Sequence, residues 1–261
     1  MHPALEHINA RRNKKVPLKD GRRIVLLVFG GVMSGMRGSG ALIGLQQLGL
    51  THAFDEIYSM SAGFPNACYF LADDPDKGPS IYYEELAGRK FINASHPWNL
   101  MDIDYLIDVF KNKKPLPVDK VLASKTKLFV IVKNLGENKI EYLEVHKVGS
   151  QNFFNLMKAA ISAPFLHPGS TKLGHSQYKD PLMWSVADYQ WQLDQILKTK
   201  ATDILVIYNN NSQYLAPALF SDRVYEIMPP AGESNGLLET RPEVLKQERD
   251  EMIALVKQLL G

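Results

Sequence analysis

The distribution of apolar residues in the first third of the chain predicts alternating strands and helices. Residues 23–29, with the sequence RIVLLVF, form an aliphatic run without polar alternation, which predicts a strand buried on both faces. A helix follows, with Leu42, Leu45 and Leu48 on its apolar face and Gly49 at its end. A second strand and a second helix complete a β-α-β-α order, so we expect a mostly parallel sheet covered by helices.

Further strands and helices are predicted over the rest of the chain. Strands are expected at 127–132 and 139–145, joined by a hairpin, and at 203–208 and 223–228. Helices are expected at 153–161 and after a capping box at 240–243. The densely apolar stretch 98–110 predicts a helix packed on the sheet, or alternatively a mobile flap over a lipid pocket. No repeat or linker divides the chain, so we expect a single α/β domain over residues 23–261.

Composition narrows the classes of function. The chain has 261 residues and is 45% hydrophobic, which is enough for a full core. Its net charge of +2 is too small to indicate a nucleic-acid partner. One cysteine, Cys68, excludes an intrachain disulfide and is typical of a reducing compartment, so we expect a cytoplasmic protein. The seven histidines show no paired spacing, so we predict no metal site.

Basic residues are concentrated ahead of the first strand. Seven lysines and arginines lie between Arg11 and Arg23, and no apolar run after them is long enough for a signal peptide or a membrane span. We interpret residues 1–22 as a solvated basic tail. The alternative is a patch that contacts anionic lipid, which would hold the protein peripherally at a membrane.

A candidate nucleophile lies in residues 56–69, which predict a strand, a sharp turn and a helix. Ser61 stands at the tip of the turn, where the backbone can hold its hydroxyl clear of the chain. Small residues around it, including Ser59 and Gly63, let the strand and the helix pass closely beneath, and Pro65 suits a first helical turn. This is the arrangement of the G-x-S-x-G nucleophile elbow, with Ser59 in the place of its first glycine.

Acyl transfer by Ser61 also needs an oxyanion hole. The loop of residues 30–40 contains five glycines, follows the first strand and leads into a helix N-terminus, whose dipole favours negative charge. We expect the backbone amides of Gly30, Gly31, Val32 and Met33 to hold the oxyanion.

The third requirement is a base for the serine proton. No histidine follows Asp180, so this aspartate cannot belong to a triad in the Ser-Asp-His chain order of α/β-hydrolases. An upstream acid with His146, His167 or His175 stays open. A Ser–Asp dyad is the simpler hypothesis, with Asp180 at the end of a strand and facing Ser61. A carboxylate is a weak base unless it is desolvated, so this hypothesis requires a largely dry pocket.

Three blocks of the chain, in this order, resemble the patatin-like phospholipases over residues 23–210. The first is GGVMSG at 30–35, with GALIGL at 40–45 and Gly49-Leu50, which is similar to the family's G-G-G-x-R/K-G and the helix behind it. The second runs from FDEI at 54–57 through Ser61-Ala62-Gly63 to Ala67 and resembles the family's elbow. The third is AISAP at 160–164 with Pro168, followed by Tyr178-Lys179-Asp180 where the family has D-G-G or D-G-A.

The resemblance implies a three-layer α/β/α patatin-like fold with a mostly parallel central sheet. It also implies a Ser–Asp dyad of Ser61 and Asp180, an oxyanion hole in the glycine-rich loop, and no cofactor. The implied activity is that of a serine acyl-ester hydrolase, acting on a lipid or a small acyl ester, as in the hydrolysis of phospholipids.

The departures from the family pattern all lie at this site. Val32 replaces the third glycine, and Ser34 replaces the cationic residue, for which Arg37 could substitute only if the loop slipped by three residues. Pro181 follows the aspartate in place of glycine, which removes an N–H and favours extended angles at Asp180. Losing one oxyanion donor costs about 10² to 10³ in turnover. The alternative function is therefore a catalytically weakened protein of this fold that serves as a lipid-binding or regulatory module.

A third hypothesis takes Gly38, Gly40 and Gly44 as a dinucleotide-binding loop. Such loops are paired with an acidic residue at the end of the next strand, but here that strand ends in Ser-Met-Ser. We therefore rank acyl-ester hydrolysis first, and expect Gly44 to bring its helix close to the sheet.

Overall fold

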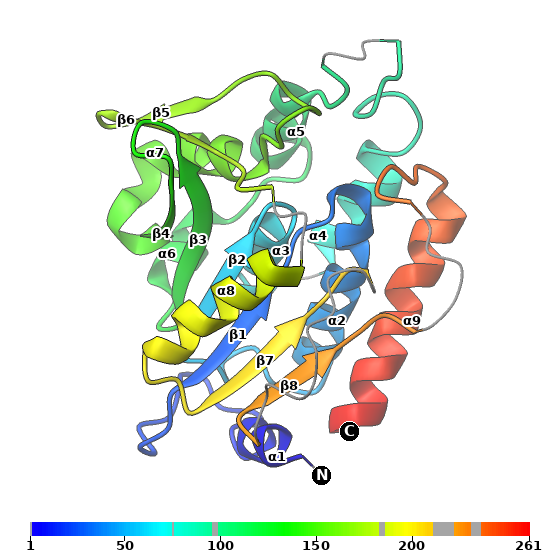
Figure 1. Cartoon of the computed structure of the whole chain (residues 1–261). Helices are drawn as coiled ribbons and strands as arrows, with labels where there is room; N and C mark the ends of the chain where they lie inside the picture. Colours follow the sequence, from blue (N-terminus) through cyan, green and yellow to red (C-terminus); the bar gives the residue numbers. More distant parts are fainter. Residues whose placement is uncertain (1, 75, 96–98, 183–185, 211–221, 231–235) are drawn as a thin grey trace.

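The protein is described from a computed structural model, which covers residues 2–74, 76–95, 99–182, 186–210, 222–230 and 236–261. Strands β1 to β8 form one sheet in the order β5-β6-β3-β2-β1-β7-β8, with β4 paired to β3. The five strands from β3 to β8 in that order run parallel, and β4, β5 and β6 are antiparallel additions at one side. Helices cover both faces (Figure 1), which confirms the predicted three-layer α/β/α fold class.

The strands match the sequence prediction closely where the apolar runs were long. Their bounds are β1 Ile24–Val28, β2 Glu56–Met60, β3 Lys127–Asn134, β4 Lys139–Glu144, β5 Thr171–Leu173, β6 Ser176–Lys179, β7 Asp203–Ile207 and β8 Val224–Ile227. The α-helices are α1 Pro3–Asn9, α2 Gly35–Gln47, α3 Gly63–Leu71, α4 Lys77–Ser80, α5 Ile103–Asp108, α6 Val118–Ala123, α7 Val145–Ile161, α8 Val186–Lys198 and α9 Pro242–Leu260. A 3₁₀ turn, η1 (Val32–Ser34), precedes α2, and π-helical turns occur at η2 (Ile81–Glu85) and η3 (Val109–Lys113).

The central strand β1 is buried on both faces, as its unbroken apolar run predicts. Leu26 and Val28 belong to the larger core, which the residues of α2, α3, α7 and α9 complete. Val25 and Leu27 point to the other face and join a smaller core closed by α8. In Figure 1, α8 crosses one face of the sheet while α2 and α9 lie on the other.

Helices α2 and α9 pack closely, and two glycines of α2 make this possible. A Cβ at Gly40 would lie 2.5 Å from the carbonyl oxygen of Arg249, and one at Gly44 would lie 2.8 Å from the Cβ of Val256. Gly44 therefore brings its helix close to α9, and not to the sheet as expected. These glycines lie inside a helix against another helix, an arrangement that leaves them no part in a dinucleotide loop.

Two other local predictions are corrected. The last helix begins at Pro242 with Arg241 as its N-cap, and no side chain caps it. The predicted capping box at 240–243 is absent because the Glu239 carboxylate accepts the amides of Thr240 and Arg241 instead. In the apolar stretch 98–110, residue 98 lies outside the described residues, and the helix α5 packs against α7 rather than on the sheet.

Residues 1–22 are structured, which corrects their interpretation as a solvated tail. The short helix α1 buries Ala4, Leu5 and Ile8 against the rest of the chain. The side chain of Arg11 is fully buried as well. Charge alone suggested exposure, because arginine is rarely buried unless it is paired, and the partners of Arg11 are distant in sequence.

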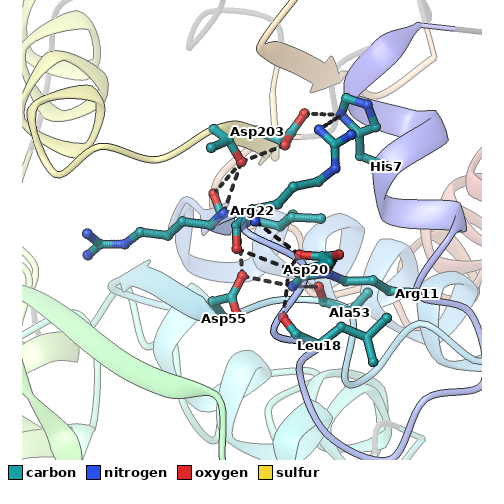
Figure 2. Close-up of polar contacts among 11 residues, drawn as sticks. His7, Arg11, Leu18, Asp20, Arg22, Ala53, Asp55 and Asp203 are labelled. Carbon is teal, nitrogen blue, oxygen red and sulfur yellow. Dashed lines mark hydrogen bonds and ion pairs between the residues drawn. The ribbon is translucent and has the colours of Figure 1, made fainter.

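Arg11 joins the N-terminal segment to the sheet (Figure 2). Its guanidinium contacts the carboxylates of Asp20 at 2.7 Å and Asp55 at 2.8 Å, and it donates to the carbonyl oxygen of Ala53 at 2.9 Å. His7 contacts Asp203 at 2.6 Å beside this cluster. Asp55 and Asp203 lie at the amino ends of β2 and β7, so the N-terminal segment covers the end of the sheet where these strands begin.

No helix that the structure describes combines the length and the apolar character that a bilayer crossing requires.

Candidate active site

Two strands that meet end to end along β3 bring Ser61 and Asp180 together. One edge of β3 pairs with β4 from Phe129 to Asn134, so β2 and β6 both occupy the other edge. On that edge β2 runs parallel to β3 and its last pair is Met60 with Ile131, while β6 runs antiparallel and its last pair is Lys179 with Lys133.

The register fixes where the next residue of each strand lies. Ser61 follows Met60 and Asp180 follows Lys179, so both advance toward Val132, the residue of β3 between the two final pairs. Two residues of a strand span about 7 Å, so the two side chains emerge from neighbouring backbone at one point of the sheet edge. The prediction that Asp180 ends a strand is confirmed by this arrangement.

Ser61 stands on a strained turn between β2 and α3. Its φ of 51° lies in the left-handed region, which non-glycine residues adopt only where the surroundings enforce it. A Cβ at Gly63 would lie 2.4 Å from the carbonyl oxygen of Val28, so α3 starts directly against β1. Ser59 is buried in β2, where its hydroxyl donates to the carbonyl oxygen of Phe129, and it needs no glycine-like backbone. The local geometry is that of a nucleophile elbow.

The Asp180 carboxyl lies in a dry environment, as a serine–aspartate dyad requires. The residue is 2% exposed, and burial raises the pKa of its carboxyl to about 6. The nearby Ser61 hydroxyl and the amide of Leu182 oppose this rise in pKa. The Leu182 amide donates to Oδ1 at 2.8 Å, whereas Oδ2 has no hydrogen-bond partner among the described residues. The Ser61 hydroxyl therefore lies near enough to affect the Asp180 carboxyl, although no hydrogen bond is formed between the two side chains.

The glycine-rich loop lies against Ser61. A Cβ at Gly30 would be 3.1 Å from Ser61 Oγ, so only a glycine leaves the hydroxyl this close to the loop backbone. The amides of Gly31 and Val32 donate no hydrogen bond to any residue that the structure describes. The amide of Met33, in contrast, donates to the carbonyl oxygen of Leu237 at 3.0 Å. Of the four amides expected to form an oxyanion hole, Met33 is thus already engaged within the chain.

Val32, which stands where the family pattern has its third glycine, adopts a left-handed backbone conformation. Its φ is 51°, a value that is highly unfavourable for a β-branched residue. Leu182, at φ 44°, is likewise a bulky residue in the left-handed region, and its amide hydrogen-bonds the Asp180 carboxyl. Backbone strain of this kind costs about 1–3 kcal/mol per residue and is concentrated at functional sites. Its clustering around Ser61 supports a functional role for this end of the sheet.

Asn209, which the sequence analysis did not single out, hydrogen-bonds the backbone of the glycine-rich loop. Its side chain is fully buried just beyond β7. The amide nitrogen Nδ2 donates to the carbonyl oxygens of Phe29 and Gly30, at 2.5 Å and 2.9 Å. Oδ1 accepts the amide of Gly38 at 2.7 Å, so one side chain ties the loop to the first turns of α2. Asn209 is the first of three consecutive asparagines, and nothing in this polar run of the sequence indicates such a role.

The remaining departures from the family pattern also have defined places. Ser34 is buried and its hydroxyl donates to the carbonyl oxygen of Gly31, which stabilises the loop turn. Arg37 does not replace a cation in the loop, because it lies within α2 and forms an ion pair with Glu248 of α9 at 2.8 Å. Pro181 contributes no N–H after Asp180, and the Leu182 amide serves that carboxyl instead.

A mostly apolar cavity opens beside Ser61. Val32 and Met33 line it on the loop side, α3 forms one wall, and Met101, Leu106 and Phe110 form another. Among the described residues, no histidine lines this cavity, and no group of three or more histidine, cysteine, aspartate or glutamate residues could bind a metal ion. This end of the sheet therefore combines a hydroxyl, a carboxyl, two amides that donate to no described residue, and an apolar chamber.

Comparisons with known proteins bear on the fold alone. No protein-family model and no curated protein matches the sequence. Among solved structures, the crystal structure of VipD from Legionella pneumophila is similar, with a TM-score of 0.50 and 10% sequence identity. The similarity covers 94% of this chain and 69% of VipD, which has a patatin-like fold. The architecture predicted from the three sequence blocks is thus similar to that of a solved structure whose sequence is only 10% identical.

Proposed function

We propose that this protein is a serine acyl-ester hydrolase of the patatin-like type, with Ser61 as nucleophile and Asp180 as base. The observation that carries the proposal is the convergence of these two residues at Val132, with Ser61 on a strained elbow and Asp180 buried beside it. A buried carboxyl whose pKa is raised to about 6 is a stronger base than an exposed aspartate and is still ionised at neutral pH.

The first half of the reaction forms an acyl-enzyme. Ser61 Oγ attacks the ester carbonyl carbon while its proton passes to Asp180, for which the unpartnered oxygen Oδ2 is available. The carbonyl oxygen becomes an oxyanion that the amides of Gly31 and Val32 stabilise. The carbon–oxygen bond to the alcohol then breaks, and the leaving alkoxide takes the proton from Asp180.

The second half releases the acid. Asp180 accepts a proton from a water molecule as the water oxygen bonds to the acyl carbon. The resulting tetrahedral intermediate expels Ser61 Oγ, which recovers its proton from Asp180, and the carboxylic acid leaves. The side chains that line the cavity supply the binding and the exclusion of water, and the proposed reaction uses no cofactor.

A lipid substrate is favoured over a polar one by the cavity. Apart from Ser61, its polar side chains hydrogen-bond other protein groups: Asn66 donates to the carbonyl oxygen of Gly35, and the Tyr69 hydroxyl donates to that of Lys114. The wall that remains is apolar and suits an acyl chain. Peripheral contact with a membrane stays a prediction, and the basic N-terminal segment would not bring lipid to the site, because it covers the opposite end of the sheet from Ser61.

A catalytically weakened lipid-binding or regulatory module is the second candidate. The specific observation in its favour is the engagement of the Met33 amide by the Leu237 carbonyl, which leaves fewer donors for an oxyanion. The lack of a hydrogen bond to Oδ2 of Asp180 also favours this second candidate, because in a fully formed dyad the serine hydroxyl would donate to the carboxylate.

Labelling with a fluorophosphonate probe separates these candidates. The hydrolase proposal expects time-dependent labelling of the wild type, none of Ser61→Ala, and strongly reduced labelling of Asp180→Asn. Hydrolysis of p-nitrophenyl esters should be lost in the same two variants, while Ser150→Ala, a change at an exposed position of α7, should leave it intact. Absence of labelling in a folded wild type that still binds lipid vesicles would instead support the regulatory module.

A further inference from the structure

The cavity beside Ser61 follows one face of α3 away from the nucleophile. Ala62, Pro65, Asn66 and Tyr69 all line it, and these positions are one to two helical turns apart on the same face. Seven residues of α-helix from Ala62 to Tyr69 span about 10 Å. The lining of the chamber therefore extends along α3 from Ser61 as far as Tyr69.

Tyr69 is held rigidly at that far end. Its hydroxyl donates to the carbonyl oxygen of Lys114 at 2.5 Å, and its ring lies 6.3 Å from the ring of Phe110. On the other side a Cβ at Gly78 would lie 3.0 Å from the Tyr69 ring, so the backbone of α4 packs directly on it. Both rings are nearly inaccessible to solvent, at 1% exposed for Tyr69 and 3% for Phe110. The end of the chamber is thus built from fixed aromatic rings.

We propose that this cavity binds the acyl chain of the substrate and that Tyr69 and Phe110 close it, which selects medium-length chains. Carbon–carbon bonds of about 1.5 Å advance an extended chain by about 1.3 Å per carbon, so a chamber of about 10 Å holds about eight carbons. Each CH₂ that fits contributes a factor of about four in affinity. Carbons beyond about the eighth add no binding free energy, because they can enter only by displacing the packed rings of Tyr69 and Phe110. The inference rests on the proposed acyl hydrolase activity for the identity of its ligand.

The chain-length profile of the wild type is the first measurement. For a series of p-nitrophenyl esters from acetyl to palmitoyl, kcat/KM should rise at each step to octanoyl and fall at least tenfold by lauroyl. Tyr69→Ala and Phe110→Ala open the end wall and should move the optimum to lauroyl or longer chains. A profile that keeps rising to palmitoyl in the wild type, or an optimum that does not move in either variant, would overturn the inference.

Two control variants separate the wall from general loss of packing. Tyr69→Phe keeps the ring and should keep the octanoyl optimum, although it loses the hydrogen bond to Lys114. Phe70→Ala removes a buried ring from the neighbouring position of α3 that does not line the cavity, and it should lower the melting temperature without moving the optimum. If Tyr69→Ala does not fold, Tyr69→Leu opens the same end with a smaller loss of volume.

A binding measurement tests the wall even if the ester hydrolase proposal fails. Calorimetric titration of Ser61→Ala with sodium octanoate, laurate and palmitate should give the tightest binding for octanoate and a gain for laurate in Tyr69→Ala. If the wild type hydrolyses no ester but shows this binding pattern, the proposed hydrolase activity is refuted and the proposed acyl-binding site is supported. If ester hydrolysis depends on Ser61 but all three fatty acids bind equally strongly, the hydrolase activity is supported and the proposed limit on chain length is refuted.

Discussion

Gly30 lies so close to Ser61 that a Cβ at position 30 would fall 2.3 Å from the Cβ of the serine. Gly30→Ala must therefore displace either the loop or the elbow, and each displacement separates the nucleophile from the loop amides. We expect the rate of fluorophosphonate labelling to drop by at least about 10²-fold, the effect of losing an oxyanion donor. Labelling should be followed by mass spectrometry on protein whose circular dichroism matches the wild type.

Gly136→Ala is the matched control for this change. Gly136 is exposed in the turn between β3 and β4, and a Cβ there would meet only Asn134 Oδ1, at an ordinary 3.6 Å. This variant should label at the wild-type rate. Equal labelling of Gly30→Ala and Gly136→Ala would mean that the loop can move without consequence for the reaction.

The carboxyl of Asp180 should make activity and stability change in opposite directions with pH. Burial raises its pKa from 3.8 to about 6, so the folded state holds a proton that the unfolded state has already released between these values. Stability from this group is present below pH 3.8 and is lost as the pH rises toward 6, whereas the ionised base that catalysis needs appears over the same range. We expect kcat/KM to rise with pH around an apparent pKa of about 6.

Asp180→Asn isolates the stability half of this prediction. A pKa raised from 3.8 to about 6 corresponds to about 3 kcal/mol of destabilisation by the ionised form. The variant should lose activity yet unfold at a higher denaturant concentration than wild type at pH 8, with the advantage vanishing near pH 4. Urea titrations at both pH values measure it, and a variant less stable than wild type at pH 8 would contradict the cause given for the pKa.

The sequence predicted the parts of the site but not how they meet. The strand at 24–28 and the elbow at Ser61 leave strong local signals, because apolar runs and small turn residues act over a few neighbours. The contact of Ser61 with Asp180 depends instead on β6 pairing antiparallel on the same edge of β3 as β2. A short strand of four residues, of which only Tyr178 is not plainly polar, gives no pattern from which that register could be read.

Other misses have the same physical origin. Arg11 looked like an exposed charge because its partners Asp20 and Asp55 are separated from it by 9 and 44 residues. Asn209 looked like part of a polar loop because its role lies in three hydrogen bonds to distant backbone. Val32 looked like a lost glycine, since a sequence shows the added Cβ but not the left-handed φ that the fold still imposes.

Asn209→Asp should impair turnover more than binding. The carboxylate keeps an acceptor for the Gly38 amide but faces the carbonyl oxygens of Phe29 and Gly30, to which asparagine donates. Repulsion at these positions should move the loop, so we expect kcat to fall by about 10²-fold, the scale of one lost oxyanion donor, while KM changes little. Steady-state kinetics with a p-nitrophenyl ester at pH 8 measures the changes in kcat and KM separately.

The control for this substitution is Asn138→Asp, which makes the same chemical change at an exposed turn. It should leave both kinetic constants unchanged. If Asn209→Asp lowers the melting temperature but keeps the wild-type kcat, then Asn209 stabilises the fold without positioning the loop.

Val32→Gly should be nearly neutral for stability, unlike most changes of valine to glycine. The substitution removes a β-branched side chain from a φ of 51°, which relieves about 1–3 kcal/mol of strain. The greater freedom of glycine in the unfolded chain costs about 1 kcal/mol and offsets part of this gain. We expect a free energy of unfolding within about 1 kcal/mol of wild type, against a loss of more than about 2 kcal/mol for the fully buried Val130→Gly in β3. Urea denaturation of both variants gives the comparison.

Arg11→Ala should destabilise the protein without reaching the active site. It leaves the carboxylates of Asp20 and Asp55 without their buried cation, for which the usual cost is about 3 kcal/mol or more. Hydrogen bonds from Arg11 lower the pKa of Asp20 to about 2, so this part of the stabilisation is present above pH 3.8 and is lost as the pH falls toward 2. The difference in melting temperature between Arg11→Ala and wild type should therefore be large at pH 7 and smaller near pH 3. Lys14→Ala, an exposed charge of the same segment, should change neither stability nor ester hydrolysis, and a comparable effect of both variants would restore the interpretation of residues 1–22 as a solvated tail.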